Sequence, residues 1–150
     1  MEAPEKLWVM GHGITPVPTT GDYDLAIGET APGVPGPPPH HHTQFAELFF
    51  VLKGEMEFTV NGETRLLREG EWVDLPPNTL HTFRNPGPGP NKWLNLHSPK
   101  GFHAFFHSFG VPATQENAFR ESVSETMVAR VGSLAATFDM HIVLEPSRVA

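Results

Sequence analysis

The chain has 150 residues and a formal net charge of −7, with 10 basic against 17 acidic side chains. At this length we expect one domain, residues 1–150, with a core large enough to fold unaided, and the lack of cysteine excludes disulfides and thiol nucleophiles. No run of basic residues is present, which argues against nucleic acid or an anionic membrane as a partner. Without an apolar secretory segment at the start or a stretch of about 18 apolar residues, we expect a soluble, cytoplasmic protein.

Proline and glycine break the first 90 residues into short apolar runs, which is typical of short strands with tight turns. Residues 1–15 are expected to form an irregular or weakly paired arm, anchored by an apolar cluster at 7–10. The alternation of Tyr23, Leu25 and Ile27 with smaller or polar residues predicts a strand. Residues 31–39 are rich in proline and glycine and predict a loop.

The run at 47–53, ELFFVLK, predicts a strand that is apolar on both faces. A strand buried on both sides needs a second cover, and another subunit could supply it. We therefore expect a homodimer.

Further strands are predicted at 55–60, 64–67, 72–75, 80–84 and 93–97. Asn61-Gly62 separates the first two and is a strong hairpin signal. After residue 98 the period changes, because phenylalanines at 102, 105, 106 and 109 follow helical spacing, and Gly110 should end that helix. A polar linker, a second helical pattern from 125 to 138 and a short apolar tail at 142–144 complete a β domain with a helical C-terminal appendage.

Histidines carry the chemical signal. In an extended segment His40 and His42 project to one face and could hold the same ion. Glu47 and His81 could join them if the chain shifts register before Glu47 and a sandwich brings the later strand alongside. Three imidazoles and one carboxylate suit one divalent transition metal ion per chain, namely Fe, Mn, Ni, Co, Cu or Zn. Taken alone, the cluster could equally be a solvated loop with a core histidine.

The spacing of these residues resembles the two motifs of the cupin family. Residues 40–54, HHHTQFAELFFVLKG, resemble the first motif, with counterparts of its ligands at His40, His42 and Glu47. Residues 70–85, GEWVDLPPNTLHTFRN, resemble the second motif, with a counterpart of its ligand at His81. The resemblance implies an all-β jelly-roll barrel (a double-stranded β-helix) over about 20–98, followed by a helical segment at about 101–140. It also implies that these four residues hold the metal.

Two positions depart from the family pattern. Val34 stands where the first motif begins with glycine, and Asn78 stands where the second motif usually has glycine. Asparagine tolerates a left-handed turn better than most residues, so the second departure is mild.

The chain looks most like single-domain, quercetin 2,3-dioxygenase-like cupins. That likeness implies a metal-dependent dioxygenase acting on a small aromatic or enolisable, flavonol-like molecule, with Glu47 as metal ligand and catalytic base. Two other functions remain open: a metal-dependent isomerase or cyclase of a small natural-product intermediate, and a binding module without turnover.

The remaining histidines receive structural interpretations. His41 should point away from its two neighbours, and His103 and His107 should lie on the polar face of the phenylalanine helix. His97 could line a cavity or be a core residue, whereas His12 and His141 show no partner pattern. Six apolar residues are candidates for a cavity wall: Phe49, Val51, Phe58, Trp72, Phe83 and Trp93.

Overall fold

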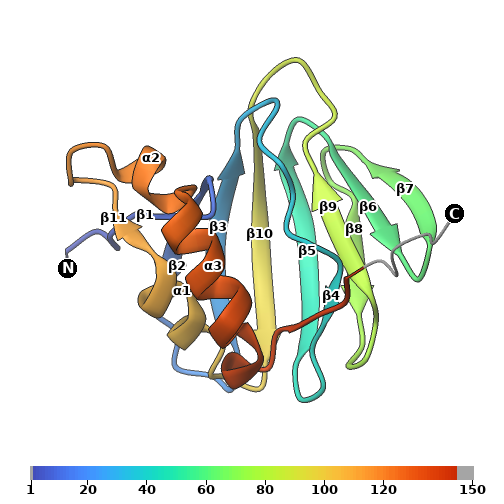
Figure 1. The fold of residues 1–150 in the computed structure, drawn as a ribbon. Helices are drawn as coiled ribbons and strands as arrows, with labels where there is room; N and C mark the ends of the chain where they lie inside the picture. Colours follow the sequence, from blue (N-terminus) through green and yellow to red (C-terminus); the bar gives the residue numbers. More distant parts are fainter. Residues whose placement is uncertain (1, 145–150) are drawn as a thin grey trace, which may run out of the picture.

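Two antiparallel β-sheets face each other in the computed structural model, which describes residues 2–144 (Figure 1). The larger sheet has the order β11-β1-β2-β3-β10-β5-β8. Its strands are β1 (Leu7–Val9), β2 (His12–Val17), β3 (Asp24–Thr30), β5 (Ala46–Lys53), β8 (Trp72–Leu75), β10 (Asn91–Ser98) and β11 (Val111–Pro112). The smaller sheet has the order β12-β4-β9-β6-β7. Its strands are β4 (His40–His41), β6 (Met56–Val60), β7 (Glu63–Leu67), β9 (His81–Arg84) and β12 (His141–Ile142).

The helices follow the strands of the β domain. They are α1 (His103–Phe109), α2 (Ala118–Ser122), α3 (Glu125–Leu134) and the 3-10 turn η1 (Ala135–Phe138). Figure 1 shows them over the β1 to β3 part of the larger sheet, while the smaller sheet faces the β5 and β8 part. The chain then crosses to the smaller sheet, where β12 pairs with β4.

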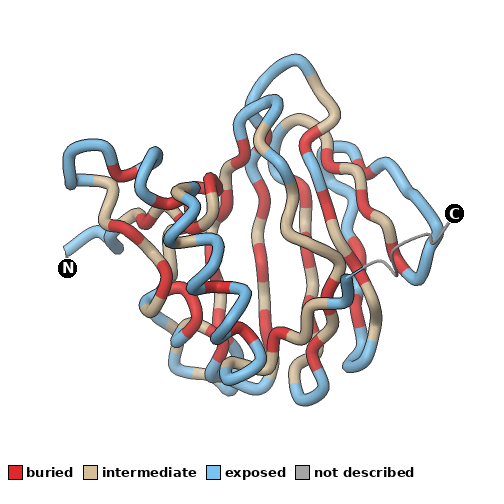
Figure 2. The backbone as a smooth tube through the Cα atoms, in the orientation of Figure 1, coloured by how far each residue is buried: buried red, intermediate tan, exposed pale blue. Residues whose placement is uncertain are grey.

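Alternating burial in β3, β5 and β10 places one side of the larger sheet in the core (Figure 2). The largest side chain of this inner face is Trp93, which is 2% exposed. It packs over Gly28 on the paired strand, where a Cβ would lie 2.3 Å from the indole. Glycine at position 28 therefore provides the space for the central aromatic residue of the core.

Several predicted local features are confirmed. Asn61 and Gly62 both have positive φ angles, 49° and 84°, in the hairpin between β6 and β7. Asn78 adopts φ 67°, so it takes the left-handed conformation expected at this position. The phenylalanine helix begins after Phe102 and ends at Gly110, and its phenylalanines are buried.

Three expectations need adjustment. Residues 1–15 are not a weakly paired arm, because β2 pairs with β3 from Gly13 to Val17; Gly11, Gly13 and Pro16 interrupt the apolar alternation that would have revealed a strand. The expected polar linker contains α2. Mostly-β architecture with facing sheets is confirmed, but a closed barrel is not, since the strand pairings of residues 2–144 stay within each sheet.

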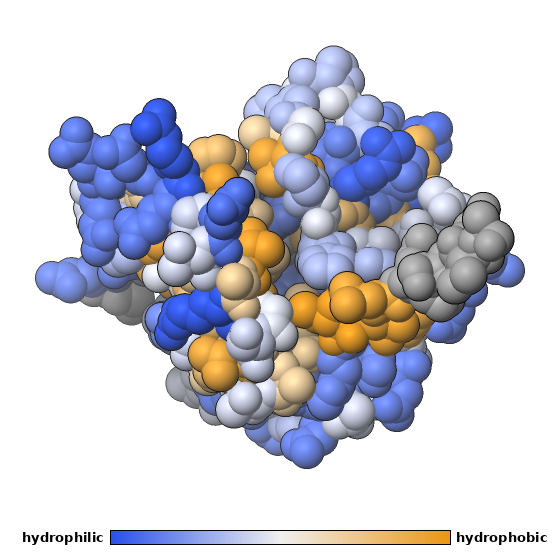
Figure 3. Space-filling model, viewed as in Figure 1, coloured by the Kyte–Doolittle hydropathy of each residue, from blue (hydrophilic) through white to orange (hydrophobic). Residues whose placement is uncertain are grey.

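The surface in Figure 3 is mostly hydrophilic, with an apolar patch beside the grey C-terminal residues. Among the described residues next to that C-terminal segment, Val143 and Leu144 are 40% and 79% exposed. Within the described part of the chain, every helix is too short or too polar to cross a membrane.

Candidate metal centre

The structure brings His40, His42, Glu47 and His81 together from three different strands or their ends. His40 in β4 pairs directly with His81 in β9, and Glu47 projects from β5. One ligand-type atom from each residue lies within 4.8 Å of all the others, and each residue is at most 5% exposed. The left-handed turn at Asn78 contributes, because the Asn78 N–H donates to the His42 carbonyl at 2.6 Å.

Each of the three imidazoles is oriented by a backbone carbonyl. The Nδ1 atoms of His40, His42 and His81 lie 3.0, 2.8 and 2.9 Å from the carbonyl oxygens of residues 38, 139 and 79. A carbonyl only accepts, so Nδ1 carries the proton and the lone pair of Nε2 is free. This arrangement of the outer partners is characteristic of histidines that bind metals.

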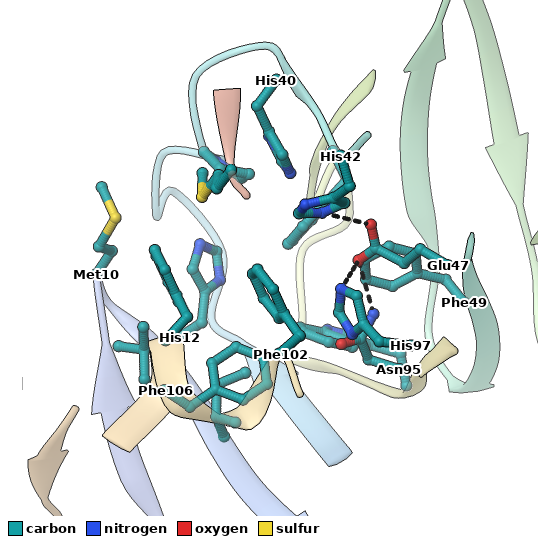
Figure 4. A pocket seen from close by; sticks show the side chains of 17 residues that line it. Met10, His12, His40, His42, Glu47, Phe49, Asn95, His97, Phe102 and Phe106 are labelled. Carbon is teal, nitrogen blue, oxygen red and sulfur yellow. Dashed lines mark hydrogen bonds and ion pairs between the residues drawn. The ribbon is translucent and has the colours of Figure 1, made fainter. Parts of the chain in front are cut away.

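Glu47 has two differently occupied oxygens (Figure 4). Oε1 accepts from Asn95 Nδ2 at 2.9 Å and lies 3.2 Å from His97 Nε2. Oε2 lies 3.1 Å from Nε2 of His42 and 3.0 Å from Nε2 of His81, and these three atoms lack hydrogen-bond partners of good geometry. Buried atoms that accept hydrogen bonds converge here, which is costly unless a proton or cation lies between them. A divalent ion fits this arrangement.

The pKa values of the site respond to the close approach of Glu47 to the imidazoles. Burial by itself would raise the pKa of Glu47, but the charge of His97 and the close contacts of His42 and His81 lower it well below its ordinary value. Burial, reinforced by neighbouring His81, lowers the pKa of His40 to about 3. Burial alone would lower the pKa of His42, but the nearby Glu47 carboxylate raises that pKa above its ordinary value overall. The lowered pKa values of Glu47 and His40 match the protonation state that metal ligation requires, whereas the raised pKa of His42 reflects its contact with Glu47, and a bound ion would displace that proton.

Two further residues surround Glu47: His97, which lines the pocket as one of its two sequence interpretations held, and Asn95, which was assigned no role from the sequence. Asn95 and His97 are 2% and 1% exposed and hold the carboxylate from β10. Their position two residues apart on a strand, on the face of Trp93, was the available signal. His41 points away as expected and stacks on His141 at 5.2 Å. His103 lies outside the site, 3.7 Å from an oxygen of Asp24.

A pocket of about 70 Å³ is lined by three of the four residues, His40, His42 and Glu47. Its walls are largely aromatic: Phe49, Phe83, Trp93, Phe102, Phe105 and Phe106. Among the expected wall residues, Val51 and Phe58 lie in the core instead, and Trp72 is 61% exposed on the outside. The sequence did not reveal His12, which also lines the pocket.

Residues 26–97, just under half of the chain, match the Cupin_2 family model, described as Cupin domain. Quercetin 2,3-dioxygenase of Bacillus subtilis is 30% identical over 73 residues, which are 49% of this chain and 21% of that enzyme. Mannose-1-phosphate guanylyltransferase RfbM of Salmonella typhimurium is 39% identical over 59 residues, which are 39% of this chain and 12% of that protein. The structure of KdgF from Halomonas sp. superimposes with a TM-score of 0.55 at 26% identity, covering 60% of this chain and 80% of that one. The alignments therefore span a small part of these curated relatives.

Proposed function

We propose that this chain is a metal-dependent dioxygenase acting on a small aromatic or enolisable molecule. The observation that carries the proposal is the convergence of Glu47 Oε2 with imidazoles whose Nδ1 atoms are fixed by carbonyls, at one end of an aromatic pocket. The segment match to quercetin 2,3-dioxygenase adds support.

The proposed roles divide among the residues of the site. His40, His42, Glu47 and His81 would hold the ion, which when bound would act as a Lewis acid for a deprotonated substrate oxygen. Glu47 is ionised and could accept the substrate's hydroxyl proton, while Asn95 holds its Oε1 in place. The aromatic walls would exclude water and align a flat substrate.

The first experiment measures the metal content of untagged protein and of His81→Ala by elemental mass spectrometry, with oxygen uptake on candidate enols. Near one redox-active ion per chain, lost in the variant, together with oxygen uptake would support the proposal. No metal after reconstitution would refute it.

Glu47→Gln tests the base role separately. We expect turnover to be abolished while metal binding weakens less than in His42→Ala, because the amide keeps one ligand oxygen but cannot take the proton. Equal turnover in Glu47→Gln and the parent would exclude this role.

A second candidate is metal-dependent isomerisation or cyclisation. The guanylyltransferase match shows that the cupin segment also occurs in a protein with a different name and activity. Product formation from an enol without oxygen consumption, especially with bound zinc, would favour this alternative. A binding module would give neither.

A further inference from the structure

A second buried imidazole faces the pocket, away from the candidate metal ligands. His12 is 6% exposed, lines the pocket and lies on its other side from Glu47 (Figure 4). It directly follows the tight turn at Met10 and Gly11, whose φ angles are 49° and 84°, so β1 and β2 fix its backbone. Its Nε2 is buried and has no hydrogen-bond partner among the described residues.

Thr30 determines which nitrogen of His12 carries the proton. The Thr30 hydroxyl lies 2.9 Å from His12 Nδ1 and 3.4 Å from Trp93 Nε1. The indole N–H can only donate, and His12 Nδ1 is the other hydrogen-bond contact given to this buried hydroxyl by the described residues, so the hydroxyl accepts from Trp93 and donates to His12 Nδ1. A neutral His12 then carries its hydrogen on Nε2, which faces the pocket as a donor.

The position of Thr30 is itself firmly fixed. Its N–H donates to Asn91 Oδ1 at 3.0 Å, and its carbonyl accepts from Asn85 Nδ2 at 2.8 Å. Thr30 is fully buried. Burial lowers the pKa of His12 to about 4, and a contact of the ring with the Pro35 carbonyl, which does not reach hydrogen-bond geometry at Nε2, opposes this shift only in part, so the ring is neutral at pH 7.

A buried donor without an acceptor of good geometry is costly, and it is retained where a ligand supplies a better acceptor. We propose that His12 Nε2–H is the second polar contact of the bound small molecule, which has an oxygen donor for the metal end, an apolar middle and an acceptor oxygen for His12. This inference rests on the proposed metal centre.

The size of the pocket narrows the ligand further. About 70 Å³ holds roughly five waters. A compact oxo acid or enol therefore suits the pocket as it stands better than a three-ring flavonol.

The test compares ligands of matched shape on protein loaded with Zn²⁺, by isothermal titration calorimetry. One pair is 2-oxopropanoate and 2-methylpropanoate; a longer pair is 4-oxopentanoate and 4-methylpentanoate. In each pair a carbonyl oxygen replaces a methyl group, and the carboxylate end stays the same. We expect the parent to favour the oxo ligand of at least one pair, and His12→Phe to reduce that preference about 5- to 10-fold.

Comparing the change in preference between parent and variant removes any direct contribution of the metal to oxo binding. Thr30→Val is the second variant. It removes the hydroxyl that fixes the hydrogen of His12 on Nε2 but leaves the imidazole in place, so it should reduce the same preference for the oxo ligand. An unchanged preference in both variants, or no binding of either pair to the parent, would overturn the inference. Zinc content is measured in parallel: one ion per chain with an unchanged preference refutes only the role of His12, whereas failure to load zinc refutes the metal centre.

Discussion

The carboxylate of Asp139 holds the loop that carries His42, one of the candidate metal ligands. It accepts hydrogen bonds from Thr43 N at 3.0 Å, Thr43 Oγ1 at 2.6 Å and Gln44 N at 2.8 Å, and it pairs with His141 Nε2 at 2.9 Å. The Asp139 carbonyl meanwhile accepts from His42 Nδ1. One residue of the C-terminal segment therefore fixes both the loop and the ring of His42.

Asp139→Asn should weaken this contact without changing the backbone, because asparagine also tolerates the φ of 60° found here. The amide group would replace one oxygen and oppose the Gln44 N–H or the donors of Thr43. Hydrogen bonds to a charged group contribute about 1.5–3 kcal/mol each, and Asp139 is partly solvated, so we expect a loss of about 2 kcal/mol in unfolding free energy. For a chain of this size that corresponds to roughly 4–8 °C in Tm.

Urea denaturation of metal-free protein measures the stability, and competition with a chelator measures metal affinity. We expect the affinity to fall by about 10-fold, the low end for outer-shell contacts, because the carbonyl that binds His42 remains. Glu116→Gln, an exposed carboxylate before α2, is the control. A variant as stable as the parent, with equal metal affinity, would refute this role of Asp139.

Three further predictions concern the metal, the pH and the assembly. Removing the metal with a chelator should lower the Tm of the metal-loaded parent in a thermal melt and leave the Tm of His81→Ala unchanged. The parent should lose about 2.7 kcal/mol of unfolding free energy if the ion was present at 100 times its Kd. The pKa of Asp24 is lowered, since hydrogen bonds from backbone N–H groups at the start of α1 outweigh its burial. Its stabilisation is thus complete above the unfolded value of 3.8 and lost as pH falls through the lower folded value, so urea melts of parent and Asp24→Asn should converge in acid but not at pH 7. We also expect a homodimer whose interface covers the outer face of β5 and β8, where Phe50 stacks on the exposed Trp72. Light scattering should show a monomer for Phe50→Asp and a dimer for the control Thr64→Asp. A monomeric parent would contradict the expected dimer.

Local chemistry made much of the β domain predictable. Asn61-Gly62 determines a hairpin by its backbone preferences, and the spacing of His40 and His42 places both rings on one side of an extended segment. These features depend on a few neighbouring residues. The four candidate ligands could therefore be named from the sequence with help from the cupin resemblance.

Features that depend on contacts between distant residues were not predictable. The proposed role of His12 depends on its hydrogen bond with Thr30, 18 residues away, and on a pocket that exists only after folding. β2 was missed because pairing with β3 overrides its glycines and proline. Trp72 was expected inside, but alternation along β8 turns it outward, since Val73 and Leu75 occupy the core face.

The candidate metal ligands and several side chains of the pocket come from different parts of the chain, and this separates metal binding from the choice of small molecule. All four candidate ligands lie within the matched segment 26–97. The pocket, however, also takes His12 from β2, Phe102 and Phe106 from the region of α1, and Met140 from the segment before β12, all outside that match. Similarity within the matched segment thus concerns the candidate ligands and one part of the pocket wall, whereas the rest of the wall and the proposed second polar contact come from the flanks. Substitutions such as His12→Phe should therefore change which molecule binds at constant metal content, and His81→Ala should remove the metal itself.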